Sequence, residues 1–216
     1  MRTRRPAEFL SLCLLVASLG GCAWIGTGER APSRVEGRLD LAADAQNPPA
    51  SLLPVVIYLD SDAPPPRPPA PPPAVRVQHD GERFGPVLAV LGRGARLEIQ
   101  NESEVHHRLF WLDTALRHSL SIPPGPGFSV QIELLEGVAR IYCELHPEEH
   151  FTVFVAPSHL FSVLDAPGPF AIDAVPPGAW RLHLWSDGFE GEVREIEVLA
   201  SETHFEEVRL GRGLLR

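Results

Sequence analysis

The stretch AVRVQHDGERFGPVLAVLGRGARLEIQ, residues 74–100, decides the fold class. Its apolar runs are short, and they are either continuous or alternate apolar with polar residues. The segments HDG and LGRG separate these runs, and glycine beside polar residues is typical of turns. Short strands at close spacing, separated by such turns, indicate a β-sandwich or a β-barrel.

The same pattern continues on both sides of this stretch. In AWRLHLW, Trp180, Leu182 and Leu184 are expected on one face of a strand, and Arg181 and His183 on the other. No segment of eleven or more residues carries a convincing helical period, so the sequence predicts an all-β protein. Further strands are expected in VEGRLDL, LLPVVIYL, FSVQIEL, ARIYC, FTVFVA, PFAIDAV, VREIEVL and HFEEVRL.

The first 21 residues are predicted to be a lipoprotein signal peptide. Arginines precede the apolar stretch FLSLCLLVASL, which is too short to span a bilayer as a helix. The stretch ends in LGGC, which resembles the lipobox of bacterial lipoproteins, so Cys22 is expected to be lipidated. Ala23 then implies the periplasmic face of the outer membrane of a Gram-negative bacterium. The alternative is an ordinary signal peptide with an incidental cysteine.

Charge and cysteine content narrow the function further. The net charge is −9, and residues 1–21 carry +3 from arginine and −1 from Glu8, which leaves −9 − 2 = −11 for the mature chain. Such an acidic chain repels phosphate backbones, so nucleic acid is not an expected partner. With Cys13 removed and Cys22 lipidated, Cys143 has no disulfide partner in an oxidising compartment. It is either a metal ligand or a buried core thiol.

Proline-rich and polar segments divide the chain. Residues 22–33 are expected to form a tether, and residues 61–73 contain APPPRPPAPPP, which prefers polyproline II. A stiff spacer is the preferred interpretation of this run, and a proline-rich recognition ligand is the alternative. The segments around it are residues 34–60, 74–156 and 157–210.

The stretch YCELHPEEH, residues 142–150, carries the chemistry. Cys143 and His146 stand three apart, and carboxylates lie between and after them. This is a metal site, a thiol nucleophile with its base, or a polar loop in which Glu148 and Glu149 are simply solvated. A catalytic thiol needs a supporting residue, an oxyanion hole and usually a helix N-terminus. Because no helix is predicted, the chain is not expected to be an enzyme.

Residues 75–156 resemble a cupredoxin of the plastocyanin and amicyanin type. In that family an F-x-P segment leads into a strand, a glycine turn and a strand that ends in asparagine, and a histidine follows six residues later. FGP at residues 84–86, Asn101 and His107 match these features, and Cys143, His146 and Pro147 match the later Cys-x-x-His-Pro loop. The resemblance implies a Greek-key sandwich with one copper ion held by His107, Cys143 and His146. A thiolate and two imidazoles are the donors of a blue-copper site.

Two residues depart from the family pattern. Glu149 occupies the position of the usual axial methionine, and a carboxylate is expected to stabilise Cu(II), lower the potential or admit zinc. His150 is an alternative ligand to Glu149, and the loop would be a relic of a metal site if Glu149 points to water. Arg108 replaces an asparagine that ties the two ligand segments together in the family, which predicts a looser site. Arg108 itself is expected to point to solvent or to pair with a glutamate.

The remaining histidines have simpler interpretations. His106 and His107 are adjacent, so only one can face the site, and the spacing favours His107. The others have no spacing typical of metal ligands and are expected to be surface or strand residues: His79, His118, His159, His183 and His204.

The C-terminal part carries a second resemblance. FSVLDAPGPFAIDAVPPGAWRLHLWSDGFEGEVREIEV is similar to the carboxypeptidase regulatory-like module, a small β-sandwich. Its missing first strands are expected in residues 34–60, so that one sandwich is interrupted by the cupredoxin-like segment 74–156. Pairing of residues 53–59 with 170–198 would favour this insertion, and pairing with 95–100 or 151–155 would exclude it.

These observations together predict a lipid-anchored periplasmic copper protein. Its expected task is electron transfer with another redox protein of the envelope. The alternatives are copper storage or delivery, and a metal-free cupredoxin-like lipoprotein with a structural or interaction role.

Overall fold

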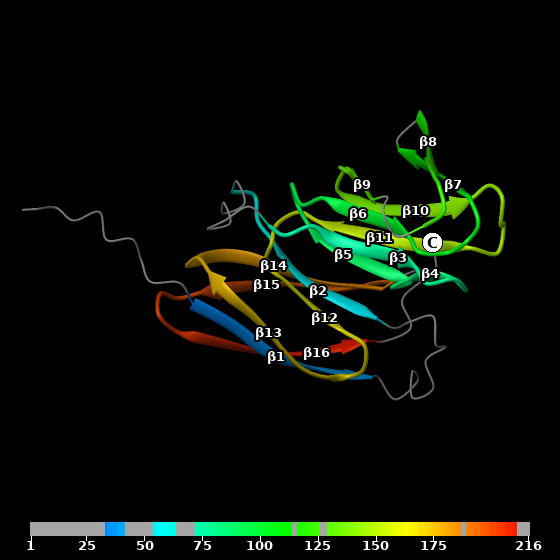
Figure 1. The fold of residues 1–216 in the computed structure, drawn as a ribbon. Helices are drawn as coiled ribbons and strands as arrows, with labels where there is room; N and C mark the ends of the chain where they lie inside the picture. Colours follow the sequence, from blue (N-terminus) through cyan, green and yellow to red (C-terminus); the bar gives the residue numbers. More distant parts are fainter. Residues whose placement is uncertain are drawn as a thin grey trace, which may run out of the picture.

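The computed structural model describes residues 33–41, 54–63, 72–113, 116–125, 129–186 and 189–210. These residues form two β-sandwiches packed side by side and contain no helix, as the all-β prediction required (Figure 1). Accordingly, the described residues contain no helix that is long and apolar enough to span a membrane. The signal peptide, Cys22, nearly all of the tether and most of the proline-rich spacer lie outside the described residues.

The first sandwich comprises the strands from β3 to β11. One sheet has the strand order β5-β11-β10-β7-β8, and the other has the order β4-β3-β6-β9. The pairs β5–β11 and β3–β6 are parallel, because the chain crosses between the sheets before it returns. The strands are β3 (Val75–His79), β4 (Phe84–Gly85), β5 (Leu88–Gly92), β6 (Leu97–Asn101), β7 (His107–Asp113), β8 (Leu116–Ile122), β9 (Ser129–Ile132), β10 (Gly137–Cys143) and β11 (His150–Ala156).

The second sandwich combines strands from both ends of the described chain. Its sheets have the orders β13-β1-β16 and β12-β2-β14-β15. The strands are β1 (Ser33–Leu41), β2 (Val55–Asp60), β12 (Phe161–Leu164), β13 (Gly168–Val175), β14 (Gly178–Ser186), β15 (Phe189–Val198) and β16 (Thr203–Leu210).

The early strands pair with the late ones. β2 lies antiparallel to β14, with Asp60 opposite Arg181 and Val56 opposite Trp185, and β1 pairs with β13 and β16. Among the described residues, neither β1 nor β2 pairs with a strand of the first sandwich. This is the pairing expected when one sandwich is interrupted by another. The chain therefore enters the first sandwich from the second one and returns to the second one when it leaves.

An aromatic cluster joins the two sandwiches. Phe154 on β11 stacks on Trp185 of β14 with ring centroids 4.5 Å apart, and Tyr58 of β2 lies 5.3 Å from Phe154. Val56 and Ala156 are buried in the same cluster. Aromatic pairs at such distances contribute about 0.5–1.5 kcal/mol each beyond the area that they bury. The two sandwiches therefore share an apolar contact.

Strand β11 is buried on both of its faces. Phe151, Val153 and Val155 point into the core of the first sandwich, whereas Phe154 and Ala156 point toward the second. This double burial explains why FTVFVA is a continuous apolar run rather than an alternating one. Because β11 begins at His150, the last residue of YCELHPEEH, the second sandwich supports one end of that loop.

Candidate metal centre

Four side chains from the YCELHPEEH loop and a neighbouring strand meet at one end of the first sandwich. His107 is the first residue of β7, and Cys143 is the last residue of β10. These strands are paired, with Cys143 opposite Leu109, so the pairing brings Cys143 beside His107. His146 and Glu149 lie in the loop between β10 and β11.

The loop is held closed by backbone hydrogen bonds. The Cys143 N–H donates to the Glu149 carbonyl at 3.0 Å, and the Glu149 N–H donates to the His146 carbonyl at 3.0 Å. The Glu144 N–H donates to the Arg108 carbonyl at 2.8 Å, which joins the loop to β7. The positions of the four side chains are thus set by main-chain structure.

The four donor atoms converge on one point. Nδ1 of His107, Sγ of Cys143, Nδ1 of His146 and a Glu149 carboxylate oxygen all lie within 4.8 Å of one another. Sγ is 3.7 Å from Nδ1 of His107 and 3.6 Å from Nδ1 of His146, and the two Nδ1 atoms are 3.1 Å apart. Nitrogen and sulfur donors at about 2.0–2.3 Å from a tetrahedral ion are themselves separated by roughly 3.3–3.6 Å. The spacing therefore suits a four-coordinate metal ion.

The tautomer of His107 is fixed by a buried serine. The Ser103 hydroxyl donates to Oδ1 of Asn101 at 2.6 Å, so its oxygen is left to accept from Nε2 of His107 at 3.1 Å. Asn101 is itself held, because its Nδ2 donates to the carbonyls of Val105 and Pro123. The proton of His107 therefore sits on Nε2, and the lone pair of Nδ1 points at the other donors.

Burial keeps His107 neutral. Its side chain is fully buried, and this desolvation lowers its pKa to about 4, although the nearby Glu149 carboxylate acts in the opposite direction. At neutral pH, Nδ1 is an unprotonated donor that is available to a metal ion.

Glu149 supplies the observation that tests whether a metal fits. Its Oε1 lies 3.2 Å from Nε2 of His79, but its buried Oε2 has no hydrogen-bond partner among the described residues. Oε2 lies 3.0 Å from the unprotonated Nδ1 of His107 and 3.7 Å from Nδ1 of His146. A buried carboxylate oxygen facing lone pairs is costly unless a cation lies between them. The donor set fits a bound metal ion.

The structure shows which histidines face the group of donors, a question that the sequence left undecided. His107 points inward, whereas the exposed His106 contacts the Ser121 hydroxyl at 2.6 Å. His150 is exposed and stacks on Tyr142, outside the group of donors. His79 is a strand histidine, which was one of the two expectations, but it is buried and lies next to Glu149.

Arg108 is exposed to solvent. Its guanidinium forms an ion pair with Glu144, which also pairs with Arg117. Since Glu144 follows Cys143 and Arg108 follows His107, this ion pair joins the two ligand-bearing segments. An exposed Arg108 or one paired with a glutamate was predicted from the sequence, and the structure shows both features.

We predict that Ser103→Ala weakens metal binding about tenfold, the lower end of the effect usual for residues that orient a ligand. The variant removes the acceptor that holds the proton on Nε2 of His107. Competition of Zn²⁺ with a chromophoric chelator measures the affinity. Ser121→Ala, which removes the contact to His106 instead, is the matched control and should leave the affinity unchanged. Equal affinities for both variants and the unmodified protein would contradict this role of Ser103.

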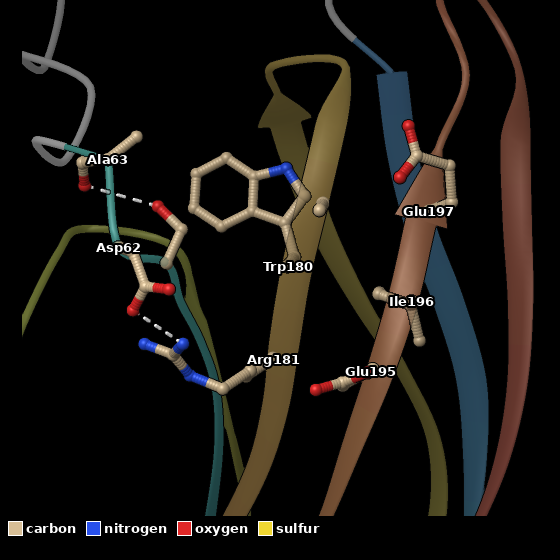
Figure 2. Close-up of a pocket in the computed structure, with 9 residues that line it drawn as sticks. Asp62, Ala63, Trp180, Arg181, Glu195, Ile196 and Glu197 are labelled. Atoms are coloured by element: carbon tan, nitrogen blue, oxygen red, sulfur yellow. Dashed lines mark hydrogen bonds and ion pairs between the residues drawn. The ribbon is translucent and has the colours of Figure 1, made fainter.

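A hollow of about 620 Å³ lies on the second sandwich, away from the metal centre (Figure 2). The Arg181 guanidinium there donates to Asp62 at 2.7 Å and to Asp60 at 2.9 Å. Trp180 lines the hollow, and its Nε1 donates to the Pro176 carbonyl at 2.8 Å. These polar groups already have partners within the protein, so the metal centre is the stronger candidate site.

Comparisons with known proteins give one family match and several similar structures. Residues 162–205 match the model of polysaccharide lyase family 4, domain II, a fibronectin-like β-sandwich. The resemblance to a carboxypeptidase regulatory-like module therefore stays a prediction. No curated protein matches the chain.

Several similar solved structures are cupredoxins. A purple cupredoxin from Nitrosopumilus maritimus is 17% identical with a TM-score of 0.32, over 38% of this chain and 98% of that one. A reduced tryptophan-to-tyrosine variant of amicyanin is 14% identical with a TM-score of 0.35, over 46% and 97%. An oxidised methionine-to-lysine variant of amicyanin is 16% identical with a TM-score of 0.32, over 38% and 81%. It is the donor atoms of this chain, and not these similarities, that indicate a bound metal ion.

Proposed function

We propose that the protein binds one copper ion through His107, Cys143, His146 and Glu149 and transfers electrons with it. The observation that carries the proposal is the convergence of two imidazole nitrogens, a thiol sulfur and an orphaned carboxylate oxygen. Nitrogen and sulfur donors bind copper strongly, and a thiolate with two imidazoles is the donor set of copper electron-transfer sites.

The residues around the donors have separate tasks in this proposal. Bound copper would supply a one-electron redox couple. Ser103 and the paired strands β7 and β10 hold His107 and Cys143 in place, so that little movement accompanies a change of charge. His146, whose side chain is 30% exposed, is the donor that reaches the surface and offers a route for the electron. Leu145, next to His146, and Val105, two residues before His107, are exposed apolar residues that would contact a redox partner.

The burial of Cys143 argues against thiol catalysis. Cys143 is only 2% exposed and is enclosed by the other donors, so a substrate could not reach its sulfur for covalent attack. We therefore propose a redox carrier rather than an enzyme.

The location of the protein is part of the same proposal. The basic and apolar start of the chain, followed by LGGC, supports acylation of Cys22 and attachment to the periplasmic face of the outer membrane. The redox partner would then be another protein of the cell envelope.

Glu149 favours a second candidate function, the storage or delivery of copper. An anionic oxygen donor stabilises Cu(II) more than Cu(I), which lowers the potential and opposes reduction. A site that holds Cu(II) in this way would retain the ion rather than pass electrons rapidly.

Copper titration followed by voltammetry tests the proposal. One equivalent of Cu²⁺ added to the purified protein should produce an intense visible band from thiolate-to-copper charge transfer. A reversible potential would then favour electron transfer, whereas irreversible reduction with loss of copper would favour storage or delivery. Absence of both the band and tight binding would favour the metal-free alternative.

A further inference from the structure

We propose that His79 is a positioning residue that fixes Glu149 as the fourth metal donor. This inference rests on the proposed copper site and goes beyond it, because it assigns a role to a residue outside the donor set. It also makes His79 a determinant of how strongly the site prefers a divalent ion.

His79 is held rigidly beneath the loop. It is the last residue of β3 and is 1% exposed, and its position is fixed by pairing with Asn101 on one side and Phe84 on the other. The edge of its ring meets the Phe84 ring, with centroids 4.8 Å apart, and the His107 ring is 4.2 Å away. The imidazole therefore has little freedom to turn.

A tight turn after β3 selects the tautomer of His79. Oδ1 of Asp80 accepts from the N–H groups of Glu82 and Arg83 at 2.9 and 3.0 Å, and Gly81 adopts a φ of 106°, which favours glycine. This turn directs the Gly81 N–H at Nδ1 of His79, 3.1 Å away. A backbone N–H can only donate, so Nδ1 accepts and the proton of the neutral imidazole must sit on Nε2.

The Nε2–H group of His79 forms a hydrogen bond with Glu149. Nε2 of His79 donates to Oε1 of Glu149 at 3.2 Å, which leaves Oε2 to face His107 and His146. His79 cannot itself bind the metal in this arrangement, since Nδ1 is occupied by Gly81 and Nε2 is protonated. The hydrogen bond orients the carboxylate, much as outer residues orient the ligands of other metal sites.

Two variants of the same residue separate this role from simple packing. His79→Leu removes the donor to Glu149, whereas the amide of His79→Gln can replace it. Both variants lose the acceptor for the Gly81 N–H, so that loss cancels in the comparison. The same leucine substitution in a Glu149→Ala background shows whether the effect passes through Glu149.

The readouts are the affinity of the purified protein for Zn²⁺ and the charge-transfer band after addition of Cu²⁺. We expect His79→Leu to lower zinc affinity about 10- to 100-fold and to shift the copper band. His79→Gln should keep both close to those of the unmodified protein. In the Glu149→Ala background, His79→Leu should have no further effect.

Three results would overturn the inference while leaving the copper site in place. They are an unchanged affinity and band in His79→Leu, an equal loss in His79→Gln, and an undiminished effect of His79→Leu when Glu149 is absent. If the unmodified protein binds neither Zn²⁺ nor Cu²⁺, the proposed function fails and this inference fails with it.

Discussion

Replacing Cys143 by serine should abolish the visible charge-transfer band of the copper-loaded protein completely. The band requires a thiolate sulfur bound to copper, and Cys143 is the free cysteine among the described residues. Copper affinity should fall by more than the roughly 10- to 100-fold that outer residues usually contribute, because a donor itself is lost. Visible absorbance and competition with a chelator measure the two effects.

The controls for this variant are straightforward. Serine is nearly the same size as cysteine, and far-ultraviolet circular dichroism should show that the sheets are retained. Cys22→Ser, which changes a cysteine outside the proposed site, should leave the band intact. If the band survives in Cys143→Ser, the site is not built on this sulfur.

Gly37→Ala should destabilise the second sandwich by about 3 kcal/mol, near the upper end of the usual effect of overpacking. Gly37 lies on β1 between β13 and β16, opposite Phe170 and Glu206. A methyl group there would collide with the Glu206 carbonyl oxygen and with the Phe170 ring. The carbonyl belongs to the β1–β16 ladder and cannot move away without disturbing hydrogen bonds. The free energy of unfolding in urea measures the loss.

Gly168→Ala is the matched control in the same sheet. Gly168 lies on β13 opposite Leu39, and a methyl group added there would have no atom within 4 Å. We expect little change in its free energy of unfolding. Equal destabilisation by both substitutions would show that the loss at Gly37 does not come from the close approach of Glu206 and Phe170.

The strands could be predicted because their patterns are local. Alternation in AWRLHLW correctly separated Trp180, Leu182 and Leu184 from Arg181 and His183, since the first three lie in the sandwich core. The pattern did not show that His183 would be half-buried. It stacks on Tyr58 of the neighbouring strand, with ring centroids 4.8 Å apart and parallel planes. This contact depends on the register of β2 against β14, which neither strand reveals by itself.

The sequence predicted the four metal donors, but it did not predict which residue would hold Glu149 in place. His107, Cys143, His146 and Glu149 were predicted from the resemblance of two short segments to cupredoxins, and the structure brings all four together. His79 lies far from them in sequence and reaches Glu149 only because β3 pairs in parallel with β6. The Asp-Gly turn directly after His79 was the available signal, since it places a backbone N–H beside the ring.

The exact partners in two polar contacts that support the site could not be identified from the sequence. The ion pair between Arg108 and Glu144 depends on the register of β7 and β10, which sets Cys143 opposite Leu109. The hydrogen bond from His107 to Ser103 depends on the buried loop that Asn101 holds. The spacing of the family pattern identified Asn101 and His107. It did not identify Ser103, which lies between them and fixes the tautomer of His107.

We propose that copper is bound by one sulfur and two imidazoles of this chain. X-ray absorption spectroscopy of the protein loaded with one equivalent of Cu²⁺ tests it most directly, because it identifies the atoms bound to the metal. We expect one sulfur and two imidazole nitrogens in the first coordination shell, with a carboxylate oxygen from Glu149. A shell of nitrogen and oxygen alone, without sulfur, would contradict the account.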